Sequence, residues 1–248
     1  MGMRLPVKMH QPFGPYFLET KCPDSILNAL NKKVEEVCSN REEVAKYCSS
    51  SGNVPNLLLR DIEVVYFTQD FLEEIGFVEF VETLGNYYIQ NVNCPLDYDN
   101  VKLSVITPEE DGTFKLSDKI LYADAWVNRY YKGDFTPYHD HGSDLAGVIV
   151  MKVPKGLDDV NLKNKESEGI DNLGRMGGRL QFLNGGNNTF THDEYIPDQE
   201  EGTVLIFPSW LSHMTYPLPV DEERRSLSFN LVSERGYYDR LYGKARQG

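Results

Sequence analysis

The feature that most constrains the fold is a succession of short strand-like segments that begins near residue 101. The segments are rich in Val, Ile, Tyr and Phe, are separated by turn residues, and have no helical periodicity between them. We expect strands at residues 102–106, 119–131, 145–153, 178–183, 203–207, 213–217 and 224–232. So many short strands without intervening helices favour a β-sandwich or jelly roll over a parallel sheet.

The first hundred residues follow a different pattern. Apolar residues recur at helical spacing in segments 23–49 and 70–92. We therefore predict a mainly β protein in which a helical N-terminal portion, residues 1–100, buttresses one sheet of a jelly-roll core at residues 101–235. The whole chain, residues 1–248, is expected to form a single domain.

Composition excludes several classes of function. The net charge of −13 argues against a nucleic-acid surface, which needs a basic footprint. No apolar run approaches the roughly 18 residues that span a bilayer, and the N-terminus lacks an apolar signal segment. The cysteines, Cys22, Cys38, Cys48 and Cys94, show no CxxC spacing and are interpreted as free thiols. These features predict a cytoplasmic protein without a nucleic-acid or membrane partner.

Histidines supply the first candidate site. In an extended segment His139 and His141 point to one face and Asp140 to the other, so the two imidazoles could bind one metal ion. The alternative is that both are merely exposed at a strand end. His213 follows the apolar strand 203–207, and neighbouring strands of a jelly roll would let it complete a three-point site.

A second candidate site lies on the segment that begins at Arg224. Alternation along a strand places Arg224, Ser226 and Ser228 on one face. A guanidinium beside a hydroxyl suits a carboxylate ligand, because Arg donates two parallel hydrogen bonds and Ser one more. The alternative is a surface charge on Arg224 paired with Glu222 or Glu223.

Several motifs in this order resemble one known family. They are Trp126-Val127-Asn128, His139-Asp140-His141, the run from Ser143 to Val148, the run from Phe207 to Pro217, and the run from Glu223 to Leu231. Together they are similar to the 2-oxoglutarate/Fe(II)-dependent oxygenases, in particular to a bacterial and phage group with the signature FPSWLxHxVxP followed by ERxSxSFNL. The resemblance covers roughly residues 120–232.

The resemblance implies a metal centre with one departure from the family pattern. His139 and His213 match the two histidine ligands of the iron triad, whereas His141 stands where the usual pattern HxD has a carboxylate. We expect His141 to be the third ligand. The alternative is that Asp140 or Asp144 replaces it, although Asp140 would point to the wrong face of a regular strand.

The resemblance also implies a binding site for the cosubstrate. Arg224 and Ser226 match the RxS pair that holds the distal carboxylate of 2-oxoglutarate. Asn128 and Tyr130 match an Asn-x-Tyr pair that contacts the cosubstrate in some relatives, and Tyr130 could equally be a packed strand aromatic. The implied cofactors are Fe(II) and 2-oxoglutarate, which is converted to succinate and CO2 while a substrate C–H bond is hydroxylated.

Water exclusion during such a reaction requires a lid. The long polar connection 155–177 and the segment 189–198 are the candidates. His192, in the second segment, is interpreted as a solvated loop histidine. Either Arg179 or Gln181 is expected to face the pocket.

Two rival functions remain open at this stage. The first is a cupin-type dioxygenase with three histidine ligands, which would not use 2-oxoglutarate. The HxH motif of this chain fits that class better than it fits the HxD pattern, but the class gives Arg224 and Ser226 no role. A non-catalytic module with a degenerate site is the third hypothesis. The substrate, a small molecule or a protein side chain, and the oligomeric state are not determined by the sequence.

Overall fold

Strands dominate the described part of the chain. The computed structural model describes residues 6–12, 14–40, 42, 63–92, 106–108, 114–116, 119–168, 176–185 and 193–234. A seven-stranded sheet contains β1 (Lys8–His10), β2 (Phe17–Lys21), β3 (Glu63–Tyr66), β6 (Ile120–Tyr130), β8 (Leu145–Lys152), β11 (Thr203–Pro208) and β13 (Arg224–Ser233). A four-stranded sheet contains β7 (Thr136–His139), β9 (Leu180–Leu183), β10 (Glu194–Tyr195) and β12 (His213–Thr215). A separate pair is formed by β4 (Ile106–Pro108) and β5 (Phe114–Leu116).

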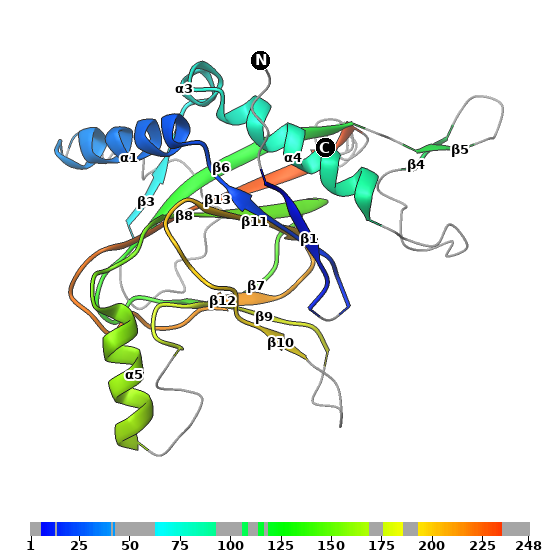
Figure 1. Cartoon of the computed structure of the whole chain (residues 1–248). Helices are drawn as coiled ribbons and strands as arrows, with labels where there is room; N and C mark the ends of the chain where they lie inside the picture. The colour runs from blue at the N-terminus through cyan, green and yellow to red at the C-terminus, as the bar shows by residue number, and fades with distance from the viewer. Residues whose placement is uncertain are drawn as a thin grey trace, which may run out of the picture.

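The two larger sheets face each other (Figure 1). The seven-stranded sheet has the order β1-β2-β11-β8-β13-β6-β3, and the four-stranded sheet has the order β10-β9-β12-β7. From β6 to β13 the chain passes repeatedly between them, with β6, β8, β11 and β13 in the larger sheet and β7, β9, β10 and β12 in the smaller. This winding is a double-stranded β-helix, so the predicted mainly β jelly roll is confirmed.

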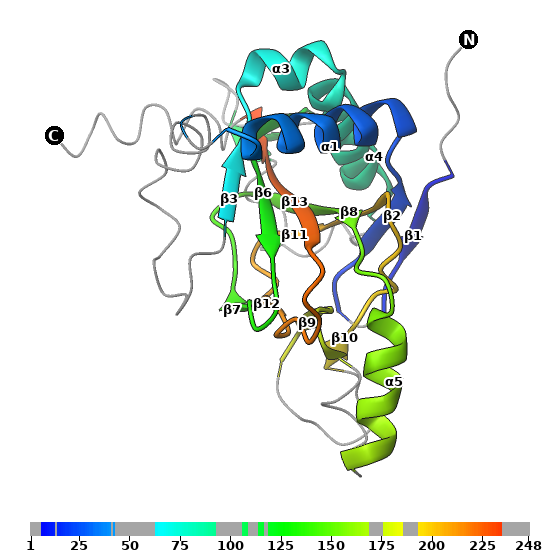
Figure 2. The same ribbon diagram turned by 90° about the vertical axis from the view of Figure 1, so that its left-hand side faces the viewer.

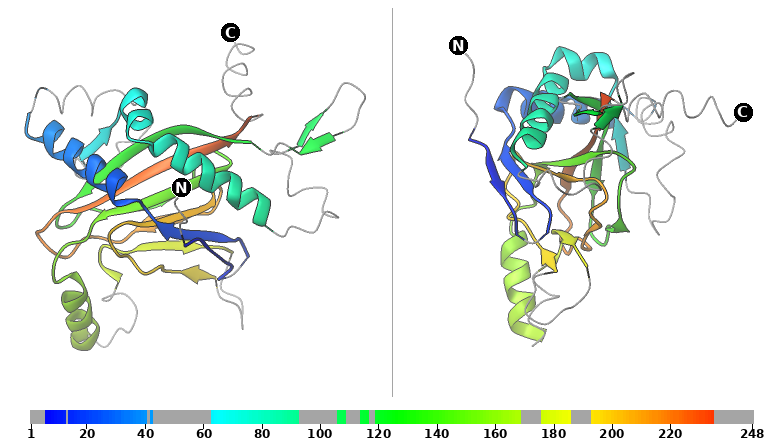
Figure 3. Two further views of the ribbon diagram at one scale, coloured as in Figure 1. Left: turned by 45° about the horizontal axis from the view of Figure 1, so that its top comes forward. Right: turned by 90° about the vertical axis from the view of Figure 1, so that its right-hand side faces the viewer.

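Helices cover the outer face of the larger sheet (Figure 3). They are α1 (Asp24–Cys38), α3 (Gln69–Glu74) and α4 (Phe77–Asn91). Leu30 of α1 and Phe77 and Leu84 of α4 belong to one buried cluster with Leu227 and Phe229 of β13. The predicted buttressing by N-terminal helices is thus confirmed. A second cluster, which includes Phe17, Val148, Phe182 and Phe207, fills the space between the sheets.

The expected strands from residue 119 onward correspond to β6, β8, β9, β11, β12 and β13. Most of the strand expected at 102–106 lies outside the described residues. The N-terminal portion is not only helical, because β1 and β2 extend one edge of the larger sheet and β3 the other (Figure 2). These strands have three to five residues, too few for alternation to stand out in sequence. The single domain stays a prediction.

The prediction of one helix over residues 70–92 is wrong in its continuity. Gly76 separates α3 from α4 and has a φ of 76°, a left-handed conformation that costs glycine little. Its backbone N–H donates to the carbonyl oxygen of Glu73, which closes the last turn of α3. The helical spacing of apolar residues continues across Gly76, so the sequence pattern does not indicate the break.

The connection at 155–177 is only partly irregular, which corrects the expectation of a loop. It contains α5 (Leu157–Glu168), which lies at the end of the molecule opposite the N-terminal helices (Figure 2). Asp158 and Asp159 occupy its first turn, where carboxylates interact favourably with the helix dipole. Leu157 packs on Tyr130 and Leu218. Because this one residue anchors α5, the helix lacks the stripe of apolar residues from which it could have been predicted.

A buried ion network attaches α1 to β13. The Glu223 carboxylate accepts hydrogen bonds from Arg129 Nε at 2.6 Å and from Arg225 Nε and Nη2, both at 2.9 Å. Arg225 also donates to Glu35 Oε1 at 2.6 Å and to Asn31 Oδ1 at 2.9 Å, both on α1. Burial alone would raise the pKa of Glu223, but the two arginines outweigh burial and lower it to about 2.

We expect the Glu223→Gln variant to be less stable than the wild type at pH 7 by about 3 kcal/mol, because Arg129 and Arg225 would both lose the buried Glu223 carboxylate that they bind. The folded-state pKa lies below the unfolded-state value, so this contribution is present above pH ~4.5 and is lost as the pH falls toward 2. Urea unfolding at several pH values should show the difference shrinking over that interval. A difference that is independent of pH would contradict the prediction.

Gly147 of β8 lies directly opposite Phe229 of β13, and a Cβ atom there would approach Phe229 Cζ to 2.0 Å. The ring cannot retreat, because it is fully buried and packs edge-on against Phe77. We expect Gly147→Ala to lower the free energy of unfolding by about 2–3 kcal/mol through overpacking. Gly142→Ala is the matched control, since its Cβ would meet nothing within 4 Å. Equal urea midpoints for the two variants would refute the clash.

Candidate metal centre

Three histidines meet where β7 and β12 pair. In this antiparallel pair His213, the first residue of β12, lies opposite His139, the last residue of β7. His141, two residues after His139, lies beside these two histidines. The hydrogen bond from its backbone N–H to the Ser209 carbonyl oxygen holds it there. The ligand atoms of the three side chains all lie within 4.8 Å of one another. The structure therefore brings together the three predicted histidines.

Hydrogen bonds determine which nitrogen of two of these rings is free. His139 Nδ1 lies 2.8 Å from the Pro137 carbonyl oxygen, and His213 Nδ1 lies 2.9 Å from that of Leu211. A carbonyl oxygen only accepts, so each Nδ1 carries the proton and each neutral ring keeps a lone pair on Nε2. His141 Nε2 lies 3.2 Å from His213 Nε2. His139 and His213 thus have the orientation typical of metal-ligating histidines, whose other nitrogen donates to a backbone carbonyl.

The surroundings of the cluster favour neutral imidazoles. His213 is only 2% exposed, and its ring lies 5.5 Å from the Phe182 ring and 5.1 Å from the Phe207 ring. Burial lowers the pKa of all three histidines, and burial together with the neighbouring His139 lowers the pKa of His141 to about 4. Neutral imidazole is the form that binds metal ions.

The two alternative ligands, Asp140 and Asp144, do not belong to this cluster of ligand atoms. Asp140 is exposed. Asp144 Oδ2 accepts a hydrogen bond from the backbone N–H of Ser233 at 2.6 Å, and the Asp144 N–H donates to the Leu231 carbonyl oxygen. Asp144 therefore joins the start of β8 to the end of β13. This arrangement supports His141 as the third ligand, which stays a prediction.

The two arginines at the start of β13 have opposite environments. Arg225 faces α1 and is paired with Glu223 and Glu35. Arg224 lies on the opposite face of β13, which is directed toward the smaller sheet, and is 2% exposed. The alternative that Arg224 is a surface charge paired with Glu222 or Glu223 is wrong, because Glu223 binds Arg225 and Glu222 accepts from the backbone N–H of Lys155.

Arg224 is a buried cation without a carboxylate partner among the described residues. Its guanidinium donates to Ser226 Oγ at 3.3 Å and to Gln199 Oε1 at 3.0 Å, and its Cζ lies 5.0 Å from the centre of the Tyr130 ring. Burial lowers the pKa of Arg224. Burying a charge is costly unless an opposite charge or hydrogen bonds compensate it, so this site favours binding an anion.

Asn128 and Tyr130 lie beside this anion site on β6. In the antiparallel pair of β6 and β13, Asn128 is opposite Ser226 and Tyr130 is opposite Arg224. The Tyr130 hydroxyl shares a hydrogen bond with Thr136 Oγ1 at 2.7 Å, and the ring also packs on Leu157. Tyr130 is thus both a packed aromatic and a neighbour of Arg224. Their contact with a cosubstrate stays a prediction.

Sequence reasoning missed Trp126 as a neighbour of the histidine cluster. Its ring centroid lies 5.6 Å from that of His141. Trp126 lies on the same face of β6 as Asn128 and Tyr130, so alternation from those residues was the signal that could have found it. That face of β6 therefore runs from the histidine cluster toward the guanidinium of Arg224.

Neither Arg179 nor Gln181 faces the histidines, which corrects that expectation. Phe182 contacts His213, and alternation along β9 puts Gln181 and Arg179 on the opposite face. There Gln181 Oε1 accepts hydrogen bonds from the hydroxyls of Tyr138 and Tyr216. Arg179 pairs with Asp158 of α5. His192 and residues 169–175 and 189–192 of the expected lids lie outside the described residues.

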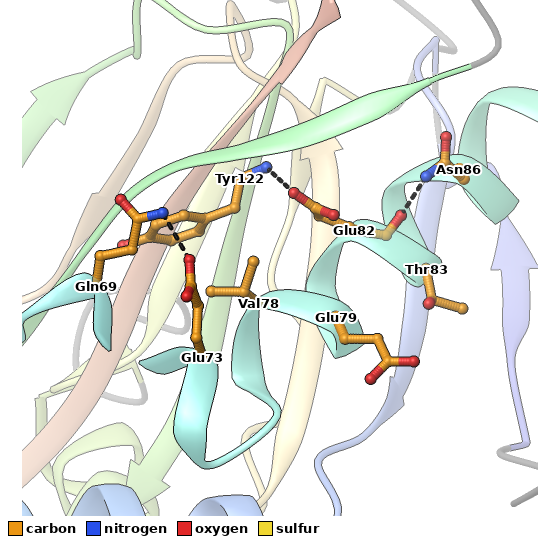
Figure 4. A pocket seen from close by; sticks show the side chains of 8 residues that line it. All are labelled: Gln69, Glu73, Val78, Glu79, Glu82, Thr83, Asn86 and Tyr122. Carbon is orange, nitrogen blue, oxygen red and sulfur yellow. Dashed lines mark hydrogen bonds between the residues drawn. The ribbon is translucent and has the colours of Figure 1, made fainter. Parts of the chain in front are cut away.

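A surface hollow of about 500 Å³ lies elsewhere, between α3, α4 and β6 (Figure 4). Several of its polar side chains are already hydrogen-bonded within the protein. Glu82 Oε1 accepts from the backbone N–H of Tyr122 at 2.9 Å, and Asn86 Oδ1 accepts from that of Ile120 at 2.8 Å. Because β3 pairs only with residues 126–129 of β6, these side chains satisfy the strand edge that β3 leaves uncovered.

We expect His141→Ala to weaken the binding of Co(II), used as a probe for divalent first-row metals, by at least about 100-fold, because one of three imidazole ligands is lost. Isothermal titration calorimetry measures this directly. Asp140→Asn should retain wild-type affinity, and His10→Ala is the control for a histidine outside the cluster. Loss of Co(II) binding in Asp140→Asn with binding retained in His141→Ala would reverse the ligand assignment.

Comparisons with known proteins agree with this geometry. Residues 124–230 match the family model described as "Putative 2OG-Fe(II) oxygenase". A comparison with curated protein sequences gave no match. Among the described residues, no helix is both long enough and apolar enough to cross a membrane.

Three solved structures are similar in fold. A prolyl-4-hydroxylase from Pseudomonas putida is 11% identical, with 88% of this chain and 92% of that chain covered and a TM-score of 0.50. AviO1 from Streptomyces viridochromogenes Tue57 is 10% identical, with 88% and 90% covered and a TM-score of 0.50. The non-haem alpha-ketoglutarate-dependent epimerase SnoN from nogalamycin biosynthesis is 10% identical, with 88% and 76% covered and a TM-score of 0.51. The family match over residues 124–230 confirms the resemblance to 2-oxoglutarate/Fe(II)-dependent oxygenases that the motifs predicted. The solved structures confirm the predicted fold.

Proposed function

We propose that the chain is an Fe(II)- and 2-oxoglutarate-dependent oxygenase of the hydroxylase type, acting on a small molecule or a protein side chain. The observation that carries this proposal is Arg224, a buried guanidinium with no carboxylate partner among the described residues. It lies on the same face of the sheet as the neighbours of the histidine cluster. A dicarboxylate that reaches from the metal centre to Arg224 would satisfy both sites.

The donor set fits the metal. His139, His141 and His213 would hold Fe(II) through imidazole nitrogens, a ligand type that suits iron. When bound, Fe(II) and 2-oxoglutarate supply the oxidising chemistry of this family, in which the cosubstrate becomes succinate and CO2. The hydrogen bonds to Pro137 and Leu211 hold the rings of His139 and His213 in place without assistance from the metal.

The remaining residues would orient the cosubstrate. On one face of β6, Trp126 contacts His141 and Tyr130 stacks on Arg224, and these two residues lie roughly 13 Å apart along the strand. The long side chain of Arg224 at one end and the imidazoles at the other make the gap that the cosubstrate would span shorter than this separation. Arg224 and Ser226 would bind the distal carboxylate, while the aromatic rings around the histidines would limit access of water.

Charge complementarity supports a dianionic cosubstrate. Three neutral histidines leave a divalent ion with its full charge, whereas a carboxylate ligand would halve it. The site would then contain the metal charge and the Arg224 charge, and 2-oxoglutarate at neutral pH carries two negative charges. The three-histidine set alone would equally suit a dioxygenase that does not use 2-oxoglutarate, so Arg224 is the residue that distinguishes the two functions.

The test is anaerobic Fe(II) binding with and without 2-oxoglutarate, followed by optical spectroscopy. We expect a weak visible charge-transfer band that requires both components. Arg224→Ala should need at least about 100-fold more 2-oxoglutarate for the same band, because a charged hydrogen-bonding partner is lost. Arg179→Ala, an arginine paired at the surface with Asp158, is the control and should behave as the wild type.

Other outcomes identify the rival functions. Iron binding without any spectral response to 2-oxoglutarate would favour the three-histidine dioxygenase. Absence of iron binding would favour the non-catalytic module. Aerobic incubation with Fe(II) and 2-oxoglutarate should also release succinate, which the rival dioxygenase would not produce.

A further inference from the structure

Gln199 makes a contact with Arg224 that no sequence motif indicates. It lies in the segment between β10 and β11, and its Oε1 accepts a hydrogen bond from Arg224 Nη2 at 3.0 Å. A guanidinium only donates hydrogen bonds, so the amide oxygen of Gln199 must face Arg224. The amide nitrogen, Nε2, is therefore the amide atom that Arg224 leaves without a hydrogen bond.

Nε2 of Gln199 is a buried donor without a partner. The atom is inaccessible to solvent, and no hydrogen-bond acceptor among the described residues reaches it. Buried polar atoms are almost always hydrogen-bonded, so this unpaired donor is available to an acceptor that binds there. These unpaired N–H groups belong to Gln199, which also contacts Arg224, the buried cation without a carboxylate partner among the described residues.

The segment that carries Gln199 is held firmly in place. The neighbouring Glu200 pairs with Lys21 of β2 at 2.9 Å. Gly202 donates its N–H to the Val150 carbonyl oxygen and accepts from the N–H of Cys22, both at 2.7 Å. These bonds to two strands of the larger sheet make Gln199 a positioned group rather than a mobile loop side chain.

We propose that Gln199 is a further binding residue of the carboxylate subsite and that it selects for a 2-oxo acid with a distal carboxylate. Its Oε1 orients the Arg224 guanidinium, and its Nε2 donates to the same carboxylate that Arg224 and Ser226 bind. This inference rests on the proposed function. It adds a donor from outside β13 to a subsite otherwise built on that strand.

The identity of the residue is part of the inference. A glutamate at position 199 would pair with Arg224 at the same distance and neutralise the cation, which would leave no net attraction for an anion. Glutamine provides the same acceptor for Arg224, but it keeps the positive charge and adds two N–H donors. The Gln199→Glu variant thus tests the charge, and Gln199→Leu tests the hydrogen bonds at similar side-chain volume.

The experiment compares two ligands of equal chain length by calorimetry on the anaerobic Fe(II)-loaded protein. They are 2-oxoglutarate and 2-oxopentanoate, which has a methyl group in place of the distal carboxylate. We expect Gln199→Leu to bind 2-oxoglutarate about 10-fold more weakly and 2-oxopentanoate unchanged. Gln199→Glu should bind 2-oxoglutarate at least about 100-fold more weakly, and its thermal unfolding temperature without cosubstrate should be at least that of the wild type, because the new carboxylate pairs with Arg224. Gln69→Leu is the matched control.

The outcomes separate this inference from the proposed function. A wild-type protein that does not prefer 2-oxoglutarate over 2-oxopentanoate would refute the proposed function, whatever Gln199 does. A wild-type preference that Gln199→Leu retains in full would overturn the role of Gln199 alone. Equal weakening of both ligands by Gln199→Leu would also overturn it, because a distal-carboxylate donor affects only one of them.

Discussion

The site depends on the alternation of side chains along β13, a strand that is paired on both sides. Because β6 and β8 hold its backbone, consecutive residues must point to opposite faces of the sheet. Arg225 enters the helix-covered face, where Glu223 and Glu35 compensate its charge. Arg224 then has to enter the face between the sheets, where no carboxylate meets it among the described residues. One strand thus holds, side by side, a cation paired with carboxylates and a cation that we propose binds a ligand.

The histidine cluster follows from a different constraint, the pairing of β7 with β12. That pairing places His139 opposite His213 although 73 residues separate them in the chain, and the backbone carbonyls of Pro137 and Leu211 orient both rings. Burial lowers the pKa values of these imidazoles and so favours their neutral form. A centre of three neutral ligands differs in charge from one with a carboxylate. In the proposed function its anionic partner is the cosubstrate, and Arg224 and Gln199 are the residues proposed to bind the other end of that cosubstrate.

Elements were predictable where a local pattern was long enough to be read. The strands from β6 to β13 that carry alternating or continuous apolar residues were found, and so was α1, whose stripe of Ile26, Leu30 and Val34 has clear helical spacing. The strands at the sheet edges, β1, β3, β7 and β10, were missed because they have only two to four residues. The α5 helix was missed because Leu157 is its main apolar contact, and the break at Gly76 was missed because a stripe does not record backbone conformation.

The sequence by itself determined which side chains lie on the same face of a strand. It placed His139 with His141 and Arg224 with Ser226, because alternation is a local property of extended chain. Only the tertiary structure decided the partners: that Glu223 binds Arg225 rather than Arg224, that His213 reaches the histidine pair, and that Gln199 contacts Arg224. These contacts join residues from different strands and loops. Their geometry depends on strand register and sheet packing, which no local pattern encodes.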